Sequence, residues 1–185
     1  MLPFIIAAAV IGLDQLSKYI ILINKDTILD IVNKDGEILF IKYIFNITYT
    51  TNPGASFGIL KDHRWVFMVL SSVALILMTA AIIYFARKKS YMLLQIALAL
   101  MFGGGVGNMI DRIFRGEVVD FIQFAFWKSF PIFNAADSFI CIGSVLFCVC
   151  IFTNRVALFG DEKSNDNDTN AAENPEETVN ESEEI

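Results

Sequence analysis

Four long apolar runs dominate the pattern of hydrophobic and polar positions along the chain. They cover approximately residues 2–23, 65–86, 91–110 and 133–153. With a rise of about 1.5 Å per residue, a helix of this length crosses the roughly 30 Å hydrocarbon core of a bilayer. The pattern therefore predicts a mostly α-helical membrane protein with four transmembrane helices.

The first apolar run could also be read as a cleaved signal peptide. However, no Lys or Arg precedes it, it has no small-x-small cleavage pattern, and Asp14 lies inside it. We therefore expect a retained first helix. Asp14 and Lys18 are four residues apart on one helix face, where they can pair and so lower the cost of burying either charge. Such a pair can be purely structural or part of a site, and the spacing leaves both open.

Between residues 24 and 60 the pattern changes to short runs that are typical of β-strands. TILDIV, at 27–32, and EILFIKYIFNITYT, at 37–50, flank Asp35-Gly36, a dipeptide that favours a hairpin turn. We expect a small β-sheet here, outside the membrane.

Two glycine-containing segments indicate that the backbone approaches another group closely. Residues 51–58 contain Asn52 and Gly54 in a turn, where an Asn is usually only a turn former. Gly103 and Gly107 form a small-xxx-small pair in the third apolar run, which lets a neighbouring helix come near. We expect this pair to bring the end of the third helix against the fourth.

Charges and aromatic residues near the apolar runs predict how the chain sits in the membrane. The RKK sequence at 87–89 lies in a short loop, which the positive-inside rule places in the cytoplasm. Four spans then put both termini in the cytoplasm and the longer loops, 24–64 and 111–132, on the outer, periplasmic side. An aromatic band suited to the membrane interface is expected to hold the second of these loops at the surface. It comprises Phe121, Phe124, Phe126, Trp127 and Phe130.

The amino-acid composition supports the membrane assignment and distinguishes an acidic C-terminal segment from the apolar rest of the chain. The chain is 55% hydrophobic with 17 Phe, while most of its acidic excess falls after Gly160. We therefore predict a membrane domain over residues 1–159 and a disordered acidic tail over 160–185. The three cysteines lie in the last apolar run and one His is present, so neither a disulfide framework nor a structural zinc site is expected.

Candidate chemistry is concentrated between residues 103 and 137. Asn-x-x-Asp occurs twice there, as Asn108/Asp111 and Asn134/Asp137, with Asp120 between the two pairs. The i, i+3 spacing predicts that each amide and carboxylate share one helix face. Ionisable residues at membrane depth are costly and usually functional. Two aspartates in contact cannot both ionise easily, so one can activate water while the other protonates the leaving amine.

Spacing alone does not decide which two of the three acids act. Asp111 could form an ion pair with the adjacent Arg112, and Asp137 could simply be favourably placed at a helix N-terminus. Asp120 is flanked by apolar residues and has no adjacent cation. The residues therefore predict a pair of catalytic aspartates without selecting its members.

Other classes of protein explain these residues less well. A small proton-coupled transporter could use the same acids as a relay, but a relay should have members across the membrane depth, and these acids cluster at one face. The Gly-x-Gly-Asp pattern of another intramembrane protease type fails because Asn108 stands where Asp is needed. Serine catalysis lacks a Gly-x-Ser-x-Gly motif, and the one histidine, His63, lies in a charged turn.

Five motifs in this order resemble lipoprotein signal peptidase (signal peptidase II), over about residues 2–155. They are Asp14-x-x-x-Lys18, Asn52-x-Gly54-Ala55-x-Phe57, Asn108-x-x-Asp111-Arg112, Val119-Asp120-Phe121 and Phe133-Asn134-x-Ala136-Asp137. The resemblance implies a bacterial inner-membrane aspartic endopeptidase that needs no cofactor. It would remove signal peptides from diacylglyceryl-modified prolipoproteins, cutting just before the lipid-bearing cysteine.

The same resemblance implies roles for individual residues. Asp120 and Asp137 correspond to the catalytic pair, and the β segment would form a cradle over the substrate. Supporting or substrate-binding roles fall to Asp14, Lys18, Asn52, Gly54, Asn108, Asp111, Arg112 and Asn134. The implied partners are lipidated prolipoproteins and membrane lipids, with no nucleic acid and no obligate protein partner. Pro53 and Ser56 depart from the usual pattern without affecting the catalytic pair.

Overall fold

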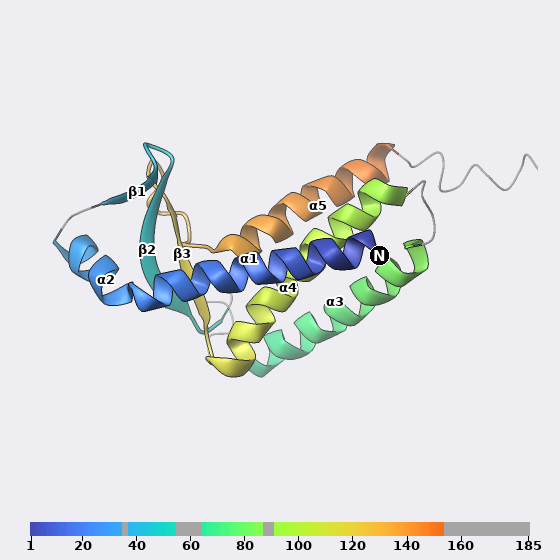
Figure 1. The fold of residues 1–185 in the computed structure, drawn as a ribbon, viewed down its shortest axis with the longest axis horizontal. Coiled ribbons are helices and arrows are strands. Elements are labelled where there is room, and N and C mark those ends of the chain that lie inside the picture. Colours follow the sequence, from blue (N-terminus) through green and yellow to red (C-terminus); the bar gives the residue numbers. More distant parts are fainter. Residues whose placement is uncertain (35–36, 55–63, 87–90, 154–185) are drawn as a thin grey trace, which may run out of the picture. The chain divides into compact units, whose positions relative to one another are not determined.

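The four apolar runs form four long helices in the computed structural model of the chain (Figure 1). The structure describes residues 1–34, 37–54, 64–86 and 91–153. The long helices are α1 (Leu2–Ile23), α3 (Arg64–Phe85), α4 (Met92–Phe114) and α5 (Ala135–Thr153). Each is long and apolar enough to cross a membrane, α3 over Met68–Phe85. The prediction of a mostly helical fold with four membrane helices is confirmed.

Helix α4 is the central helix of the unit formed by residues 1–148. About 56% of its membrane-length segment is buried, against 6% for α3, which therefore offers the most surface to lipid. Helices α1 and α3 both pack on α4, whose small residues Ala97 and Ala99 are fully buried. Gly143 of α5 also lies against the Ala97 carbonyl oxygen.

Three glycines of α4 set how closely its neighbours approach. A Cβ at Gly103 would meet Val10, and one at Gly107 would meet Asp14, so this pair faces α1. The prediction that the Gly103/Gly107 pair meets the fourth helix is wrong. Gly104 does so: its Cβ would lie 2.5 Å from the carbonyl oxygen of Ala136 in α5. One residue turns the helix by about 100°, which is why adjacent glycines serve different partners.

Replacing Gly104 by alanine is expected to disturb the junction of α4 and α5. The obstructing atom is a backbone oxygen, and overpacking of this kind costs about 1–3 kcal/mol, or about 5 °C in Tm. The matched control is Gly12→Ala in α1, where nothing lies within 4 Å and the gain in helix propensity should leave Tm unchanged or higher. Thermal unfolding in detergent measures both. Equal Tm values for the two variants would contradict a close α4–α5 contact at Gly104.

A three-stranded antiparallel sheet lies at the end of the helices where α1 ends and α5 begins (Figure 1). Its strands are β1 (Ile38–Ile41), β2 (Phe45–Asn52) and β3 (Val118–Phe124), in the order β1-β2-β3. In the β2–β3 register Phe45 pairs with Phe124 and Thr50 pairs with Asp120, with an irregularity between Ile47 and Thr50. This pairing brings the end of β2 next to Asp120.

The region between α1 and β1 differs from its prediction. Residues 27–32, predicted as a strand, belong to helix α2 (Lys25–Asn33). Ile28 and Val32 lie one helical turn apart and pack against Val119 and Phe121, so tertiary burial favours a helix over local strand propensity. The turn of the β1–β2 hairpin lies at 42–44, where Tyr43 has φ 66°, and not at Asp35-Gly36, which is outside the described residues.

Two further boundaries change the picture of the site. β3 lies inside the segment 111–132, which was predicted as a loop. Helix α4 continues to Phe114, beyond the predicted end at 110, so Asp111 and Arg112 are helical residues. The motif residues Ala55 and Phe57, the basic residues at 87–89, His63 and the predicted tail, 160–185, lie outside the described residues.

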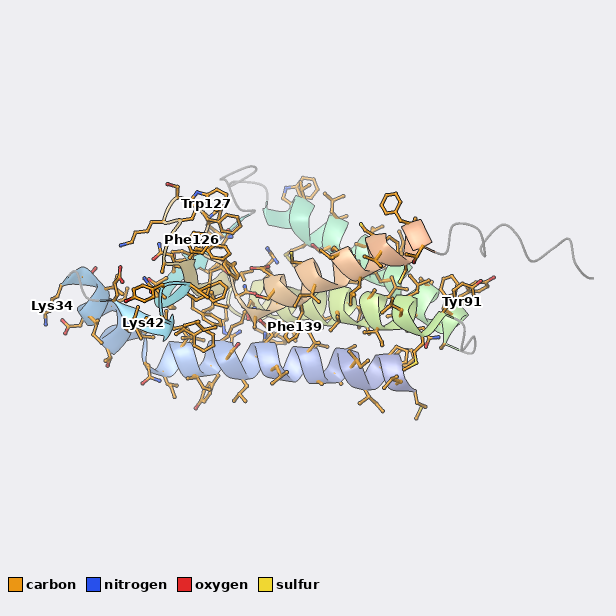
Figure 2. All side chains as sticks on the ribbon, turned by 90° about the horizontal axis from the view of Figure 1, so that it is seen from above. Lys34, Lys42, Tyr91, Phe126, Trp127 and Phe139 are labelled. Carbon is orange, nitrogen blue, oxygen red and sulfur yellow. The ribbon has the colours of Figure 1, made fainter. Side chains whose placement is uncertain are left out.

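Only part of the predicted aromatic band is exposed. Phe126 and Trp127 project outward at the sheet end of the molecule, and Tyr91 lies at the other end of the long helices (Figure 2). Phe121, in contrast, is only 5% exposed, because it faces the core beneath α2. Its assignment to a surface band is therefore wrong.

Candidate active site

Asp120 and Asp137 are joined through one asparagine. The Asn134 side-chain amide donates to Oδ1 of Asp120 at 2.6 Å, and its backbone N–H donates to Oδ2 of Asp137 at 3.2 Å. Asn134 is fully buried and Asp120 is 3% exposed. A single rigid residue thus orients both carboxylates.

The second Asn-x-x-Asp motif is a helix cap. Asn134 precedes the first residue of α5, and its Oδ1 accepts the N–H of Asp137 at 3.0 Å. Because the Asp137 carboxylate accepts the N–H of Asn134 in return, the two form a reciprocal capping arrangement. The predicted shared helix face is therefore wrong for this pair. The cap also explains the local fold, since it fixes the start of α5 and the orientation of Asp137.

Asn108 connects the two acids to a buried lysine. Its Nδ2 donates to Oδ1 of Asp137 at 2.8 Å, and its Oδ1 accepts hydrogen bonds from Asn134 at 3.1 Å and from Lys18 Nζ at 3.0 Å. The first motif thus belongs to the same network as the second, although it lies in the last two turns of α4.

Lys18 is enclosed by two carboxylates. Its Nζ is 2.9 Å from Oδ2 of Asp14 and 2.9 Å from Oδ2 of Asp111, and all three side chains are fully buried. Buried charges are tolerated only when they are paired and hydrogen-bonded. The predicted Asp14–Lys18 pair is confirmed. A simple ion pair of Asp111 with the adjacent Arg112 does not describe this acid fully, because Lys18 and Arg115 bind its carboxylate.

Two residues of this network were missed in the sequence. Gln15 donates from Nε2 to Asp14 at 3.1 Å, to the Gly107 carbonyl at 3.0 Å and to Asp111 at 3.3 Å. Arg115 binds Asp111 and also donates to Oε1 of Gln15 at 3.3 Å. A polar Gln in an apolar run, and an Arg four residues after Asp111, were the available signals.

Backbone N–H groups also donate hydrogen bonds to the two supporting acids, Asp14 and Asp111. Oδ1 of Asp14 accepts the N–H of Ala136 at 3.0 Å, which ties α1 to the first turn of α5. Oδ2 of Asp111 accepts the N–H of Val119 at 3.3 Å, which ties α4 to β3. The supporting acids therefore fix the elements that carry Asp120 and Asp137.

Asn52 and Arg112 approach the acid pair from two other elements. Nδ2 of Asn52 donates to Oδ2 of Asp120 at 3.3 Å, and its own Oδ1 accepts the N–H of the buried Gly54 at 3.0 Å. Arg112 donates to the Asn108 carbonyl at 3.3 Å and interacts electrostatically with Asp137, Asp120 and Asp111. The structure thus brings together all ten of the predicted site residues.

The surroundings of Asp120 strongly favour its protonated form. Burial, and next the neighbouring charge of Asp137, raise the pKa of Asp120 from its usual 3.8 to about 7. Hydrogen bonds from Asn134 and Asn52 and the charge of Lys18 oppose this rise. Near neutral pH the pair can therefore hold one proton, which suits acid–base chemistry. In the part of the chain that the structure describes, no group of three or more His, Cys, Asp or Glu side chains could hold a metal ion.

An apolar pocket of about 590 Å³ lies directly against Asp137. Phe124, which shares the Asp120 face of β3, lines this pocket and packs on Phe45 and Phe133, which also line it, with ring centroids 5.1 and 5.4 Å away. The other lining residues are Phe130, Pro131, Ser138, Ile140, Cys141 and Ile142. The acid pair therefore borders a surface that fits apolar groups.

Four membrane-length helices and an aspartate pair bridged by asparagine, with Asp120 buried and Asp137 half-buried, define a membrane protein equipped for aspartic-peptidase chemistry. The family described as Signal peptidase (SPase) II matches residues 6–153 of the chain. The chain belongs to the signal peptidase II family, whose members are aspartic peptidases, and is a multi-pass bacterial membrane protein. This assignment gives no support to the transporter alternative.

Individual relatives agree with the family assignment. A lipoprotein signal peptidase from Halalkalibacterium halodurans is 39% identical over 162 residues, covering 85% of this chain and 96% of the relative. One from Bacillus pumilus is 42% identical over 152 residues, covering 80% and 91%. Two solved chains, described as bacterial membrane enzymes determined by the in meso method, share the fold. Their TM-scores are 0.63 and 0.60 at 32% and 36% identity, and each match covers 86% of this chain and 93% of the solved one.

Proposed function

We propose that the protein removes signal peptides from diacylglyceryl-modified prolipoproteins, cutting before the lipid-bearing cysteine, with Asp120 and Asp137 as the catalytic pair. The observation that carries this proposal is the bridging of both carboxylates by Asn134. The same pair adjoins an apolar pocket and contains a carboxyl group whose pKa is raised to about 7.

The pair divides acid and base roles between its members. Asp120, whose pKa is raised to about 7, carries the shared proton, and Asp137 acts as the general base. Asp137 takes a proton from water, and the resulting hydroxide adds to the carbonyl carbon of the scissile peptide bond. Asp120 then gives its proton to the departing nitrogen as the C–N bond breaks. The products are a signal-peptide carboxylate and the free amine of the lipidated cysteine.

The remaining residues hold this pair in place. Asn52 and Asn134 position Asp120, while Asn108 positions Asp137. Asp14, Lys18 and Asp111 lock α1, α4 and the start of α5 together. Arg112 offsets the negative charge that the three acids concentrate at the site.

The apolar pocket beside Asp137 receives part of the substrate. Apolar residues of a signal peptide, or an acyl chain next to the scissile bond, match its phenylalanine lining. Binding energy gained there, away from the reacting atoms, can position the peptide bond at the acid pair.

We place both chain termini in the cytoplasm and the site near the outer, periplasmic face. The sheet lies at one end of the helices, and the end of α3 and the start of α4 lie at the other (Figure 1). Asp120 in β3 and Asp137 in the first turn of α5 belong to the sheet end. In the sequence, the basic residues at 87–89 fall between α3 and α4 and so belong to that second end. Positive charge in a short loop favours the cytoplasmic side of the membrane.

A cleavage assay on matched substrates tests the proposal. The purified full-length chain in detergent should convert a diacylglyceryl-modified prolipoprotein into a product that begins with the lipidated cysteine, as read by mass spectrometry. The same precursor without the lipid should be cleaved at least about 100-fold more slowly, because remote binding energy is lost. Equal cleavage of both precursors would contradict the substrate assignment, and cleavage of neither would contradict the activity.

A further inference from the structure

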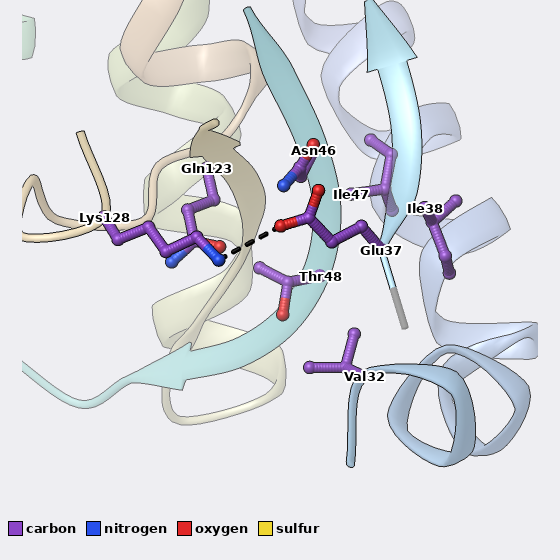
Figure 3. Close-up of a pocket in the computed structure, with 8 residues that line it drawn as sticks. All are labelled: Val32, Glu37, Ile38, Asn46, Ile47, Thr48, Gln123 and Lys128. Atoms are coloured by element: carbon purple, nitrogen blue, oxygen red, sulfur yellow. Dashed lines mark hydrogen bonds and ion pairs between the residues drawn. The ribbon is translucent and has the colours of Figure 1, made fainter. Parts of the chain in front are cut away.

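A second, smaller pocket is lined by residues of all three strands of the sheet (Figure 3). Side chains alternate along a strand, so Gln123 of β3 points away from the face that bears Asp120 and Phe124. The pocket has a volume of about 210 Å³. Its lining residues are Val32, Glu37, Ile38, Asn46, Ile47, Thr48, Gln123 and Lys128. It is therefore separate from the substrate pocket.

One residue that lines this pocket, Asn46, carries an unpaired polar atom. Asn46, opposite Gln123 in the β2–β3 register, is only 4% exposed. Its Oδ1 is buried and has no hydrogen-bond partner among the described residues. Leaving a buried acceptor unpaired is costly, so such a group calls for an explanation. An N–H or O–H donor from a ligand would satisfy it.

The mouth of the pocket is spanned by an ion pair. Nζ of Lys128 is 3.0 Å from Oε1 of Glu37, and the side chains are 67% and 47% exposed (Figure 3). An exposed pair of this kind contributes little to stability, so a ligand that satisfies both charges can replace it at small cost. The pocket thus offers a positive group, a negative group and a buried acceptor to one small molecule.

The surroundings of Lys128 favour a lipid as the source of that molecule. Phe126 and Trp127 directly precede Lys128 and are 69% and 54% exposed (Figure 2). Exposed aromatic and basic residues next to membrane helices gather at the level of the lipid headgroups. The volume is also below the roughly 300–1,000 Å³ of sites for drug-sized ligands, but it accommodates a headgroup.

We propose that this pocket binds the headgroup of a phospholipid that carries a primary ammonium and a phosphate, as in phosphatidylethanolamine. The ammonium donates to Glu37 and to Oδ1 of Asn46, and the phosphate accepts from Lys128. A trimethylammonium headgroup has no N–H to donate, and a glycerol headgroup has no cation for Glu37. The site should therefore discriminate among phospholipids of equal acyl chains.

Lipid titrations of the full-length chain test this proposal. Trp65→Phe leaves Trp127, next to Lys128, as the sole tryptophan reporter. Short-chain phosphatidylethanolamine added in detergent should change its emission in a saturable way, with an affinity at least about tenfold higher than phosphatidylcholine or phosphatidylglycerol. Glu37→Gln and Lys128→Gln should each weaken this binding about tenfold. Asn46→Leu should abolish the preference over phosphatidylcholine.

Matched controls come from a second exposed ion pair on α2. Asp30 and Lys34 are 2.8 Å apart and similarly exposed, so Asp30→Asn and Lys34→Gln remove the same charges outside the pocket. Each should change the affinity by less than about twofold. Equal binding of the three lipids, or equal losses in control and pocket variants, would overturn the proposal. If soluble phosphoethanolamine binds as tightly as the lipid, the site takes a free zwitterion and the lipid assignment is wrong.

Discussion

Asp120→Asn and Asp137→Asn are each expected to lower the cleavage rate of a lipidated prolipoprotein by at least about 1,000-fold. An amide cannot take a proton from water or carry the shared proton to the leaving nitrogen, yet it keeps the shape of the carboxylate. Asn134 can still donate to Oδ1 at position 120, while the hydrogen bond from Asn52 to Oδ2 is lost because an amide nitrogen replaces that oxygen. Rates measured with saturating substrate in detergent give the result. Asp30→Asn on the exposed face of α2 is the control and should retain full activity.

The Asp120→Asn variant should also gain stability as it loses activity. Because the folded-state pKa of Asp120, about 7, exceeds its usual 3.8, the parent protein loses stability as pH rises between about 4 and 7. The full difference is equivalent to about 4 kcal/mol, and asparagine does not titrate. The Tm of the variant relative to the parent should therefore rise from pH 4 to pH 8. A constant difference across this range would contradict the raised pKa.

Lys18→Met is expected to destabilise the protein by about 3–5 kcal/mol. The substitution keeps the apolar stem but leaves Asp14 and Asp111 buried without the cation that lies 2.9 Å from each. Both acids also hold backbone N–H groups of α5 and β3, so cleavage should fall together with stability. Unfolding in detergent, followed by tryptophan fluorescence and by proteolysis, measures the loss.

The chain contains its own control for this prediction. Lys34 also follows an aspartate by four residues, but Lys34 and Asp30 are 73% and 64% exposed. Lys34→Met should change stability by less than about 1 kcal/mol. If Lys18→Met is equally mild, the buried cluster does not depend on charge pairing. Adding Asp14→Asn to Lys18→Met should recover part of the loss, since Arg115 still pairs with Asp111 and Asp14 is the acid left without a cation.

The helical part of the fold could be predicted because membrane helices carry a strong signal. A long run without charges admits few other structures, and the Asp14–Lys18 spacing stands out in such a run. Helix α2 could not be predicted in this way. Its nine residues contain β-branched side chains typical of strands, and only burial of Ile28 against Val119 and Phe121 selects the helix.

The sequence identified the residues of the site better than it identified which of them contact one another. Polar residues in apolar surroundings identified Asp120, Asn108 and Asn134, but the choice of Asp120 as partner of Asp137 depended on the family resemblance. Spacing could not reveal this partnership, because the position of Asp120 depends on the pairing of β3 with β2. The last residue of β2, Asn52, lies 68 residues before Asp120 along the chain. Long-range pairing leaves no local pattern. Gln15 was missed for the same reason, because its partners Gly107 and Asp111 are far away along the chain, whereas the spacing of Arg115 from Asp111 was a local signal that was overlooked.

The most direct test of a shared catalytic pair is the single-turnover cleavage rate of Asp120→Asn, Asp137→Asn and the double variant. If the two carboxylates act as one unit, either substitution removes the function of the pair, and the double variant is no slower than the slower single variant. Multiplied losses in the double variant would mean that the two acids act independently. Full activity in either single variant would show that the corresponding carboxylate is not catalytic.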